Sequence, residues 1–230
     1  MAHLKKILIT PFFGDLPEWF PAFKLHFGEF LAREGYSWLF TQDLQDFNDR
    51  CDARLGFYSS VRWNSGKLWD YRPTLGLLYD DLIRGFDFWG HTDLDCVFGR
   101  VSNWVSDEFL AELDLHSNHP VYVCGCWSLY RNIARVNNLF REAAPTEWIA
   151  ELENPEPSGW VETRFSRMLE ASGLRYKYTF YQGDPYTSEP KLEYKDGRLY
   201  QYPQFKYAPD IKTKEEIMMY HFRRSKRWPL

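Results

Sequence analysis

Apolar runs of strand length alternate with segments of helical periodicity over most of this sequence. Residues 5–10 (KKILIT) carry a continuous apolar run that stops at Pro11, which is typical of a buried parallel strand. Residues 16–35 then place large apolar side chains at helical spacing before Gly35, and residues 36–43 form a second strand-like run. Strands that alternate with helices predict an α/β sandwich with a mostly parallel central sheet flanked by helices.

The same reasoning assigns the remaining elements. We expect a helix over 70–85, a strand across 87–99, a helix near 106–114, a strand over 119–132 that leads into a helix up to residue 143, and a helix over 162–172. Residues 191–202 alternate around Asp196-Gly197, which predicts a β-hairpin. Residues 151–158 indicate a surface loop, and residues 213–224 a helix or a partly extended segment.

The bulk composition limits the class of protein. The chain has 230 residues, of which 44% are hydrophobic, so we expect one core and a single domain over residues 1–230. A formal charge of -4 gives no reason to expect general binding to nucleic acids or anionic membranes. No apolar run approaches the roughly 18 residues that span a bilayer, and the N-terminal run is too short for a secretory signal. Four cysteines are too few for a disulfide framework, so we expect reduced thiols and a cytoplasmic protein.

Two aspartates interrupt the apolar stretch DFWGHTDLDCVFG (87–99). Asp93 and Asp95 stand two positions apart, so in an extended chain their side chains share a face. In an open α/β sheet the carboxyl ends of the strands form the ligand-binding edge, and carboxylate pairs there suit Mg²⁺ or Mn²⁺. A cation would allow the two like charges to lie together. The alternative is a pair of solvent-facing turn aspartates.

The sequence around this pair resembles a family of small bacterial and viral glycosyltransferases with the nucleotide-sugar-binding fold called GT-A, which is Rossmann-like. The pattern D-Y-R-P-x-x-G (70–76) leads into D-F-W-G-x-x-D-x-D-x-x-x-G (87–99). The resemblance extends weakly to PFFGDLPEWF, GCWSLYRN, WVETRFSRML and YHFRRSK. One departure is Gly125-Cys126, where the family pattern has glycine and histidine.

The resemblance implies a metal-dependent enzyme of polysaccharide biosynthesis. Such an enzyme moves a sugar, as a hexosyltransferase does, from a UDP- or dTDP-sugar to a hydroxyl of a glycan or glycoprotein, with Mn²⁺ or Mg²⁺ as cofactor. Asp95 would bind the metal directly, and Asp93 would contact the donor, or the metal through water. His221 would supply a further metal ligand; without the resemblance, a lone histidine beside aromatic residues is more often structural.

Further residues are expected to hold the donor. Pro11, Phe12 and Asp43 follow the first two strands and would lie along the nucleotide, and the basic segment 219–230 would close over the donor site. The remaining donor-binding candidates are Lys67, Asp70, Arg72, Arg223, Arg224 and Lys226. Two alternatives stay open: Asp70 as a helix N-cap, and the basic residues as a solvated tail.

The acceptor side rests on three residues. An inverting transfer needs a general base beside the acceptor hydroxyl, and Glu162 is the candidate. Trp160 and Trp127 are expected to contact the acceptor. Glu162 also suits the first turn of a helix, where the helix dipole favours an acidic residue, and a retaining enzyme would need no such base.

Two other classes of protein compete with this hypothesis. A metal-dependent phosphoesterase or nuclease also uses paired carboxylates, although two-metal sites commonly need more acidic ligands than this pair. A non-catalytic carbohydrate-binding protein would use the aromatic side chains without chemistry. Nucleic-acid binding by RRSKRW (223–228) is the weakest alternative. The sugar, the nucleotide base and the acceptor stay open.

Overall fold

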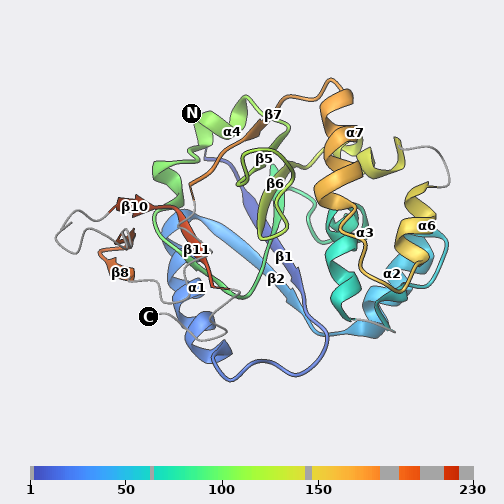
Figure 1. Cartoon of the computed structure of the whole chain (residues 1–230), viewed down its shortest axis with the longest axis horizontal. Coiled ribbons are helices and arrows are strands. Elements are labelled where there is room, and N and C mark those ends of the chain that lie inside the picture. Colours follow the sequence, from blue (N-terminus) through green and yellow to red (C-terminus); the bar gives the residue numbers. More distant parts are fainter. Residues whose placement is uncertain (1–2, 63–64, 143–146, 182–191, 203–214, 223–230) are drawn as a thin grey trace, which may run out of the picture.

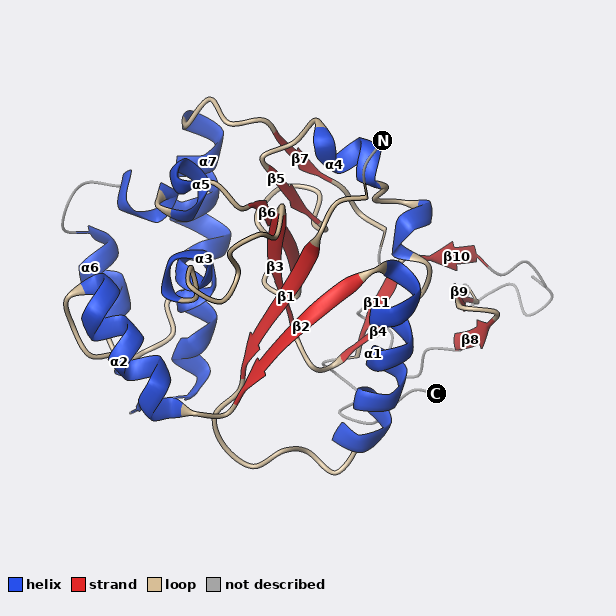
Figure 2. Cartoon of the chain, turned by 180° about the vertical axis from the view of Figure 1, so that it is seen from behind, coloured by secondary structure: helices blue, strands red, loops and turns tan. Residues whose placement is uncertain are grey.

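A six-stranded sheet forms the centre of the computed structural model, which describes residues 3–62, 65–142, 147–181, 192–202 and 215–222. The strands lie in the order β2-β1-β3-β6-β5-β7 (Figure 1 and Figure 2). They are β1 (Lys6–Pro11), β2 (Tyr36–Thr41), β3 (Phe88–Thr92), β5 (Leu115–Ser117), β6 (Trp127–Arg131) and β7 (Tyr176–Tyr178). Strand β6 is antiparallel to both of its neighbours, and the other strands of the sheet run in one direction. The predicted mostly parallel sheet is confirmed.

Helices cover both faces of this sheet (Figure 2). Helix α1 (Phe20–Glu34) and the short α4 (Asp107–Ala111) pack on one side. The opposite side carries α2 (Leu44–Leu55), α3 (Leu75–Leu78), α5 (Ala134–Asn137), α6 (Glu147–Glu153) and α7 (Ser166–Ala171). The predicted α/β sandwich is therefore confirmed. Among the described residues, no helix combines the length and the apolar character needed to cross a membrane.

Alternation along β1 divides the interior into two cores. Ile7 and Ile9 belong to the cluster on the α2 side, whereas Leu8 belongs to the cluster on the α1 side. Aromatic rings fill both clusters. On β3 and β6, Trp89 and Tyr130 are cross-strand partners whose rings stack with centroids 4.2 Å apart. Much of the aromatic content of this chain is therefore core.

The segment around the acidic pair is two strands in two different sheets. Strand β3 ends at Thr92, and β4 (Cys96–Phe98) leaves the central sheet to pair with β11 (Met219–His221) in an antiparallel ribbon. Asp93 and Asp95 lie in the link between the two sheets. Residues 213–224 are extended where the structure describes them, so the helical alternative for this segment is wrong.

Two other expectations need correction. The expected helix over 70–85 is shortened to α3, which covers Leu75–Leu78 after Pro73, and a 3₁₀-helix, η2 (Ser65–Thr74), precedes it and contains Pro73. Residues 119–126 are a loop before β6 and not the start of a strand, and this loop is buried from Val123 onward. The amide of Val123 donates to Ser166 Oγ and that of Cys124 to Ser117 Oγ, so side chains replace the ladder bonds of a strand.

The remaining elements are short. The hairpin over 191–202 is confirmed as β8 (Leu192–Lys195) and β9 (Arg198–Gln201), with positive φ at Asp196 and Gly197, and β10 (Glu215–Ile217) extends it into a small sheet. Three further 3₁₀-helices are η1 (Ser60–Arg62), η3 (Val101–Asn103) and η4 (Leu139–Glu142), and η5 (Val161–Phe165) is a π-helical turn. The π-turn precedes α7 directly and carries Glu162.

Candidate active site

A cavity of about 820 Å³ lies at the carboxyl edge of the central sheet. The ends of β1 and β3 contribute to its wall, and so does the loop 124–126, because β6 runs in the opposite direction and begins at the same edge. Helix η2 and the π-turn η5 add side chains from the α3 side, and β11 adds its last residue. This edge is where open α/β sheets bind ligands.

The two aspartates and His221 meet in this cavity. The ribbon of β4 and β11 pairs Cys96 with His221, and the amide of Phe222 donates to the carbonyl of Asp95. Nε2 of His221 lies 3.0 Å from Oδ1 of Asp95 and 3.7 Å from Oδ2 of Asp93. Three residues that the sequence separates by up to 128 positions therefore form one polar cluster.

Asp95 and His221 of this cluster, together with the neighbouring Cys96, could hold a divalent cation. Ligand atoms of Asp95, His221 and Cys96 all lie within 4.8 Å of one another. Carboxylate oxygen and imidazole nitrogen are ligands that Mn²⁺ accepts. Burial lowers the pKa of His221, but the hydrogen bond to Asp95 and the charges of Asp95 and Asp93 outweigh it, so the pKa lies above its usual value. The cluster attracts positive charge.

Arg72 joins Asp93, the first aspartate of the pair, to the opposite wall. It comes from η2 and forms an ion pair with Asp93. Gly125 packs directly against it: a Cβ added there would overlap the Arg72 guanidinium and would lie 3.7 Å from Oε1 of Glu162. Arg72 and Glu162 therefore both border Gly125. Only glycine leaves room for this arrangement.

Glu162 lies on the cavity wall in the π-turn, as the candidate base must. The amide of Glu162 donates to the carbonyl of Gly159 over 3.2 Å, and that of Phe165 donates to the carbonyl of Trp160 over 3.0 Å. Single π-turns are rare and often occur at functional sites. The structure thus brings Glu162 into the same cavity as Asp93, Asp95 and His221.

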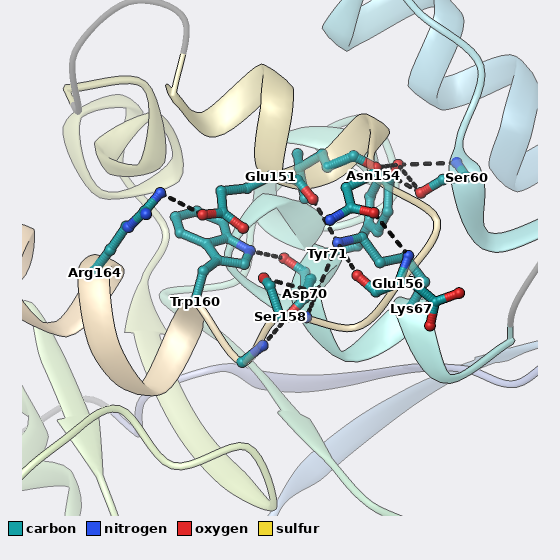
Figure 3. A network of polar contacts seen from close by, with 12 residues as sticks. Ser60, Lys67, Asp70, Tyr71, Glu151, Asn154, Glu156, Ser158, Trp160 and Arg164 are labelled. Carbon is teal, nitrogen blue, oxygen red and sulfur yellow. Dashed lines mark hydrogen bonds and ion pairs between the residues drawn. The ribbon is translucent and has the colours of Figure 1, made fainter.

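The structure separates the candidate donor-binding residues into groups. Pro11, Phe12 and Arg72 line the cavity. Asp43 instead caps helix α2, where its side chain accepts from the amide of Asp46, and it does not line the cavity. Lys67 and Asp70 lie fully buried behind the wall in a polar network (Figure 3), so their assignment to the donor is corrected. Arg223, Arg224 and Lys226 lie outside the described residues.

The two tryptophans expected at the acceptor are core residues. Trp127 is 0% and Trp160 2% exposed, so neither ring offers a face to a ligand. The cavity is lined instead by Trp69 and Phe180, which are 59% and 49% exposed. Sequence reasoning missed both. The available signal for Trp69 is its place directly before the D-Y-R-P motif.

The cysteines are free thiols, as expected. All four are buried, and Sγ of Cys124 lies 3.0 Å from Sγ of Cys126 beside the cavity. The hydrogen bond that the Cys124 thiol donates to Cys126, together with burial, raises the pKa of Cys124 well above its usual value. The neutral thiol is therefore the stable form at the cavity wall.

Comparison with known sequences assigns the central part of the chain to a sequence family. Residues 39–156 match a family described as a family of unknown function (DUF6625). The chain belongs to this family. No curated protein matches this DUF6625 member in sequence.

Three solved structures share limited similarity with this DUF6625 chain. One is a glycosyltransferase involved in the glycosylation of the major capsid of PBCV-1, with 13% identity and a TM-score of 0.46 over 78% of this chain and 84% of the other. A Drosophila β1,4-galactosyltransferase 7 mutant with manganese, UDP-Gal and xylobiose has 15% identity and a TM-score of 0.44 over 76% and 65%. Mouse xyloside xylosyltransferase 1 in its apo form has 10% identity and a TM-score of 0.45 over 96% and 86%.

Proposed function

We propose that this protein is a GT-A-type glycosyltransferase that uses Mn²⁺ or Mg²⁺ and transfers a sugar from a nucleoside-diphosphate sugar to a hydroxyl of a glycan or glycoprotein. The observation that carries the proposal is one cavity with two kinds of group. Asp95 and His221 provide converging metal-ligand atoms, and Glu162 provides a carboxylate on the same cavity. An inverting transferase needs both a place for a diphosphate and a base for the acceptor.

Asp95 and His221 would hold the cation, with Asp93 beside them. The bound cation would neutralise negative charge on the diphosphate of the donor. Arg72 keeps Asp93 in place and adds a positive charge at this part of the wall. Pro11 and Phe12, at the end of β1, offer an apolar surface and backbone groups to the nucleotide. UDP and dTDP are the candidate nucleotides.

Glu162 is the proposed general base of an inverting transfer. Its carboxylate takes the proton from the acceptor hydroxyl while the acceptor oxygen forms a bond to the anomeric carbon of the donor sugar. The bond between that carbon and the diphosphate oxygen breaks, and the nucleoside diphosphate leaves with the electron pair. Trp69 and Phe180 would flank the acceptor, since their exposed rings lie on the same cavity as Glu162.

The decisive experiment incubates the protein with a panel of UDP- and dTDP-sugars, with and without Mn²⁺, and measures nucleoside diphosphate and inorganic phosphate separately. We expect one donor to release nucleoside diphosphate slowly, only with the metal, and without inorganic phosphate. Glu162→Gln should keep metal-dependent UDP binding and lower transfer by at least about 100-fold. The surface variant Asp49→Asn, on α2, is the control and should match the wild type.

Three results would contradict the proposal. Release of inorganic phosphate would favour the phosphoesterase. Sugar binding that survives chelation, without any nucleotide binding, would favour a carbohydrate-binding protein. Metal-independent turnover would remove the role of the carboxylate pair.

A further inference from the structure

We propose that the buried ion pair of Lys67 and Asp70 is a positioning device that sets the place of Glu162 in the cavity, and through it the rate of transfer. The inference rests on the proposed function, because it assigns Glu162 a reacting role. It concerns two residues that touch no ligand. Both are buried, at 0% and 1% exposure, and both come from η2 (Figure 3).

Lys67 uses all three of its ammonium protons inside the protein. Nζ donates to Oδ2 of Asp70 over 2.8 Å, to the carbonyl of Glu156 over 3.1 Å, and to the carbonyl of Glu151. The other two acceptors are the carbonyl of Glu151 near the end of α6 and that of Glu156 in the connecting segment 154–160, which lies between α6 and the π-turn. Lys67 therefore fastens the beginning of that segment to η2.

Asp70 fastens the end of the same segment. Its Oδ2 accepts from the amide of Ser158 over 2.8 Å, and its Oδ1 accepts from the amide of Gly159 over 3.1 Å. The carbonyl of Asp70 accepts from Nε1 of Trp160 over 2.8 Å. Three consecutive residues are thus held by one aspartate, and they lead directly into the turn that carries Glu162.

The same short helix also holds the other wall of the site. Arg72 follows Asp70 by two positions and contacts Asp93. Helix η2 therefore connects Glu162 to the acidic pair. Asp70 binds the residues that precede Glu162, and Arg72 binds Asp93, which would face the donor. A shift of the segment 158–160 relative to η2 would move Glu162 away from the position where it can reach an acceptor hydroxyl.

A buried ion pair is an uncertain source of stability, because desolvation of both charges offsets their attraction. The backbone groups bound by this pair give it a different role. Carboxylate oxygens can accept several amide protons at once, and each charge-assisted bond is short and directional. The pair is suited to fix a loop that has no regular structure of its own. Reacting groups need such fixing, since a displacement of about 1 Å can cost about 100-fold in rate.

The test compares Asp70→Asn with Tyr71→Phe. Asparagine removes the charge that pairs with Lys67 and replaces one of the two acceptor oxygens with an NH2 group, which cannot accept from an amide. Phenylalanine at position 71 removes a hydroxyl that donates to the carbonyl of Leu152 over 2.8 Å and accepts from the amide of Ser60. The substitution therefore loosens the attachment of α6 and leaves residues 158–160 bound to Asp70. Both variants should lower the melting temperature. Hydrogen exchange of peptides covering 157–165 should accelerate at least about tenfold in Asp70→Asn alone.

Kinetics then separate positioning from stability. In Asp70→Asn, kcat for transfer should fall at least about tenfold, while the Kd of UDP with Mn²⁺ changes by less than about twofold. Tyr71→Phe should keep kcat. Unchanged exchange over 157–165, or equal kcat values in the two variants, would overturn the inference. Without transferase activity in the wild type, the proposed function fails and the exchange experiment still decides whether the pair holds the turn.

A milder variant keeps the test valid if Asp70→Asn does not fold. Trp160→Phe removes the bond from Nε1 to the carbonyl of Asp70 and leaves both charges paired, and it also reduces the volume of a buried ring that packs against Phe165. We expect faster exchange over 157–165 and a kcat lowered about threefold, with unchanged UDP affinity. An unchanged kcat together with unchanged exchange would count against the positioning role.

Discussion

Nε2 of His221 lies 3.0 Å from Oδ1 of Asp95, although Asp95 directly precedes β4 and His221 ends β11, 126 positions later in the sequence. The pairing of β4 with β11 creates this contact, because Cys96 and His221 are direct partners in the ribbon. One carboxylate and one imidazole thus converge at the edge where the main sheet ends. Metal binding is the first property that this contact makes testable.

Mn²⁺ should stabilise the wild-type protein and leave Asp95→Asn unchanged. A metal that binds only the folded state adds about 2.7 kcal/mol at 100 times its Kd, which corresponds to a rise in Tm of roughly 5–10 °C for a chain of this size. Differential scanning fluorimetry with a manganese titration measures the shift, and a chelator should reverse it. An equal rise in Asp95→Asn would place the metal elsewhere.

Gly125→Ala should reduce transfer by about 100-fold, because the new methyl group overlaps the Arg72 guanidinium and breaks its contact with Asp93. Gly28→Ala is the matched control. Nothing lies within 4 Å of a Cβ at Gly28 in α1, so alanine there should raise the free energy of unfolding by about 0.5–1 kcal/mol. Steady-state kinetics and urea unfolding of both variants check this. Full activity in Gly125→Ala would show that Arg72 is dispensable at that position.

Stability should fall as the pH drops below 6.5. Burial, followed by the charge of Arg33, lowers the pKa of His26 from 6.5 to about 4, and its Nε2 accepts from the amide of Phe98 over 2.9 Å. Between these two pH values the unfolded chain binds a proton that the folded protein does not, so the free energy of unfolding falls with falling pH. The loss from His26 alone is about 2 kcal/mol between about pH 7 and about pH 5.

Urea unfolding at the two pH values tests this expectation. His26→Gln keeps an acceptor for the amide of Phe98 and cannot titrate, so its stability should depend less on pH than that of the wild type. Burial also lowers the pKa of His116, to about 3, and this contribution remains in both proteins. Identical pH dependence of wild type and variant would contradict the prediction for His26.

Trp69→Ala should raise the KM for the acceptor about tenfold, the equivalent of roughly 1.4 kcal/mol, without changing donor affinity. The indole is exposed on the cavity that holds Glu162, so its loss removes contact area for the acceptor alone. Tyr58→Ala is the control, because Tyr58 is 53% exposed and does not line the cavity. Trp69→Phe should restore part of the affinity. A raised donor KM would assign Trp69 to the nucleotide instead.

The regular part of this fold and the acidic pair were predictable from local sequence. Strands β1 and β2 are apolar runs, and the aromatic spacing of 16–35 matches α1. Helix α2 was missed, although Phe47, Cys51 and Leu55 form a spaced apolar stripe and Asp43 is a strong N-cap. The polar residues between them obscured the apolar periodicity of this helix. Asp43 was expected to contact the nucleotide because it follows the second strand.

The errors in the candidate site have a common physical cause. Lys67 and Asp70 carry the charges that a donor site needs, but partners up to 89 positions away satisfy those charges inside the protein. Trp127 and Trp160 have aromatic rings of the kind that bind sugars, but both are buried. Trp127 faces the core from β6, and Trp160 is held in the network around Asp70. Trp69 lies next to Asp70 and is exposed. Local sequence states which groups are present, whereas long-range contacts decide which of them meet a ligand.

The ribbon of β4 and β11 has a consequence for the order in which this protein matures. During translation Asp95 is synthesised well before His221. Closing the long loop between these two residues is entropically slow. A nascent chain can therefore assemble β1, β2 and β3 while the acidic pair still lacks its imidazole neighbour. Competence to capture a metal would therefore arise only after β11 has been synthesised and has paired with β4.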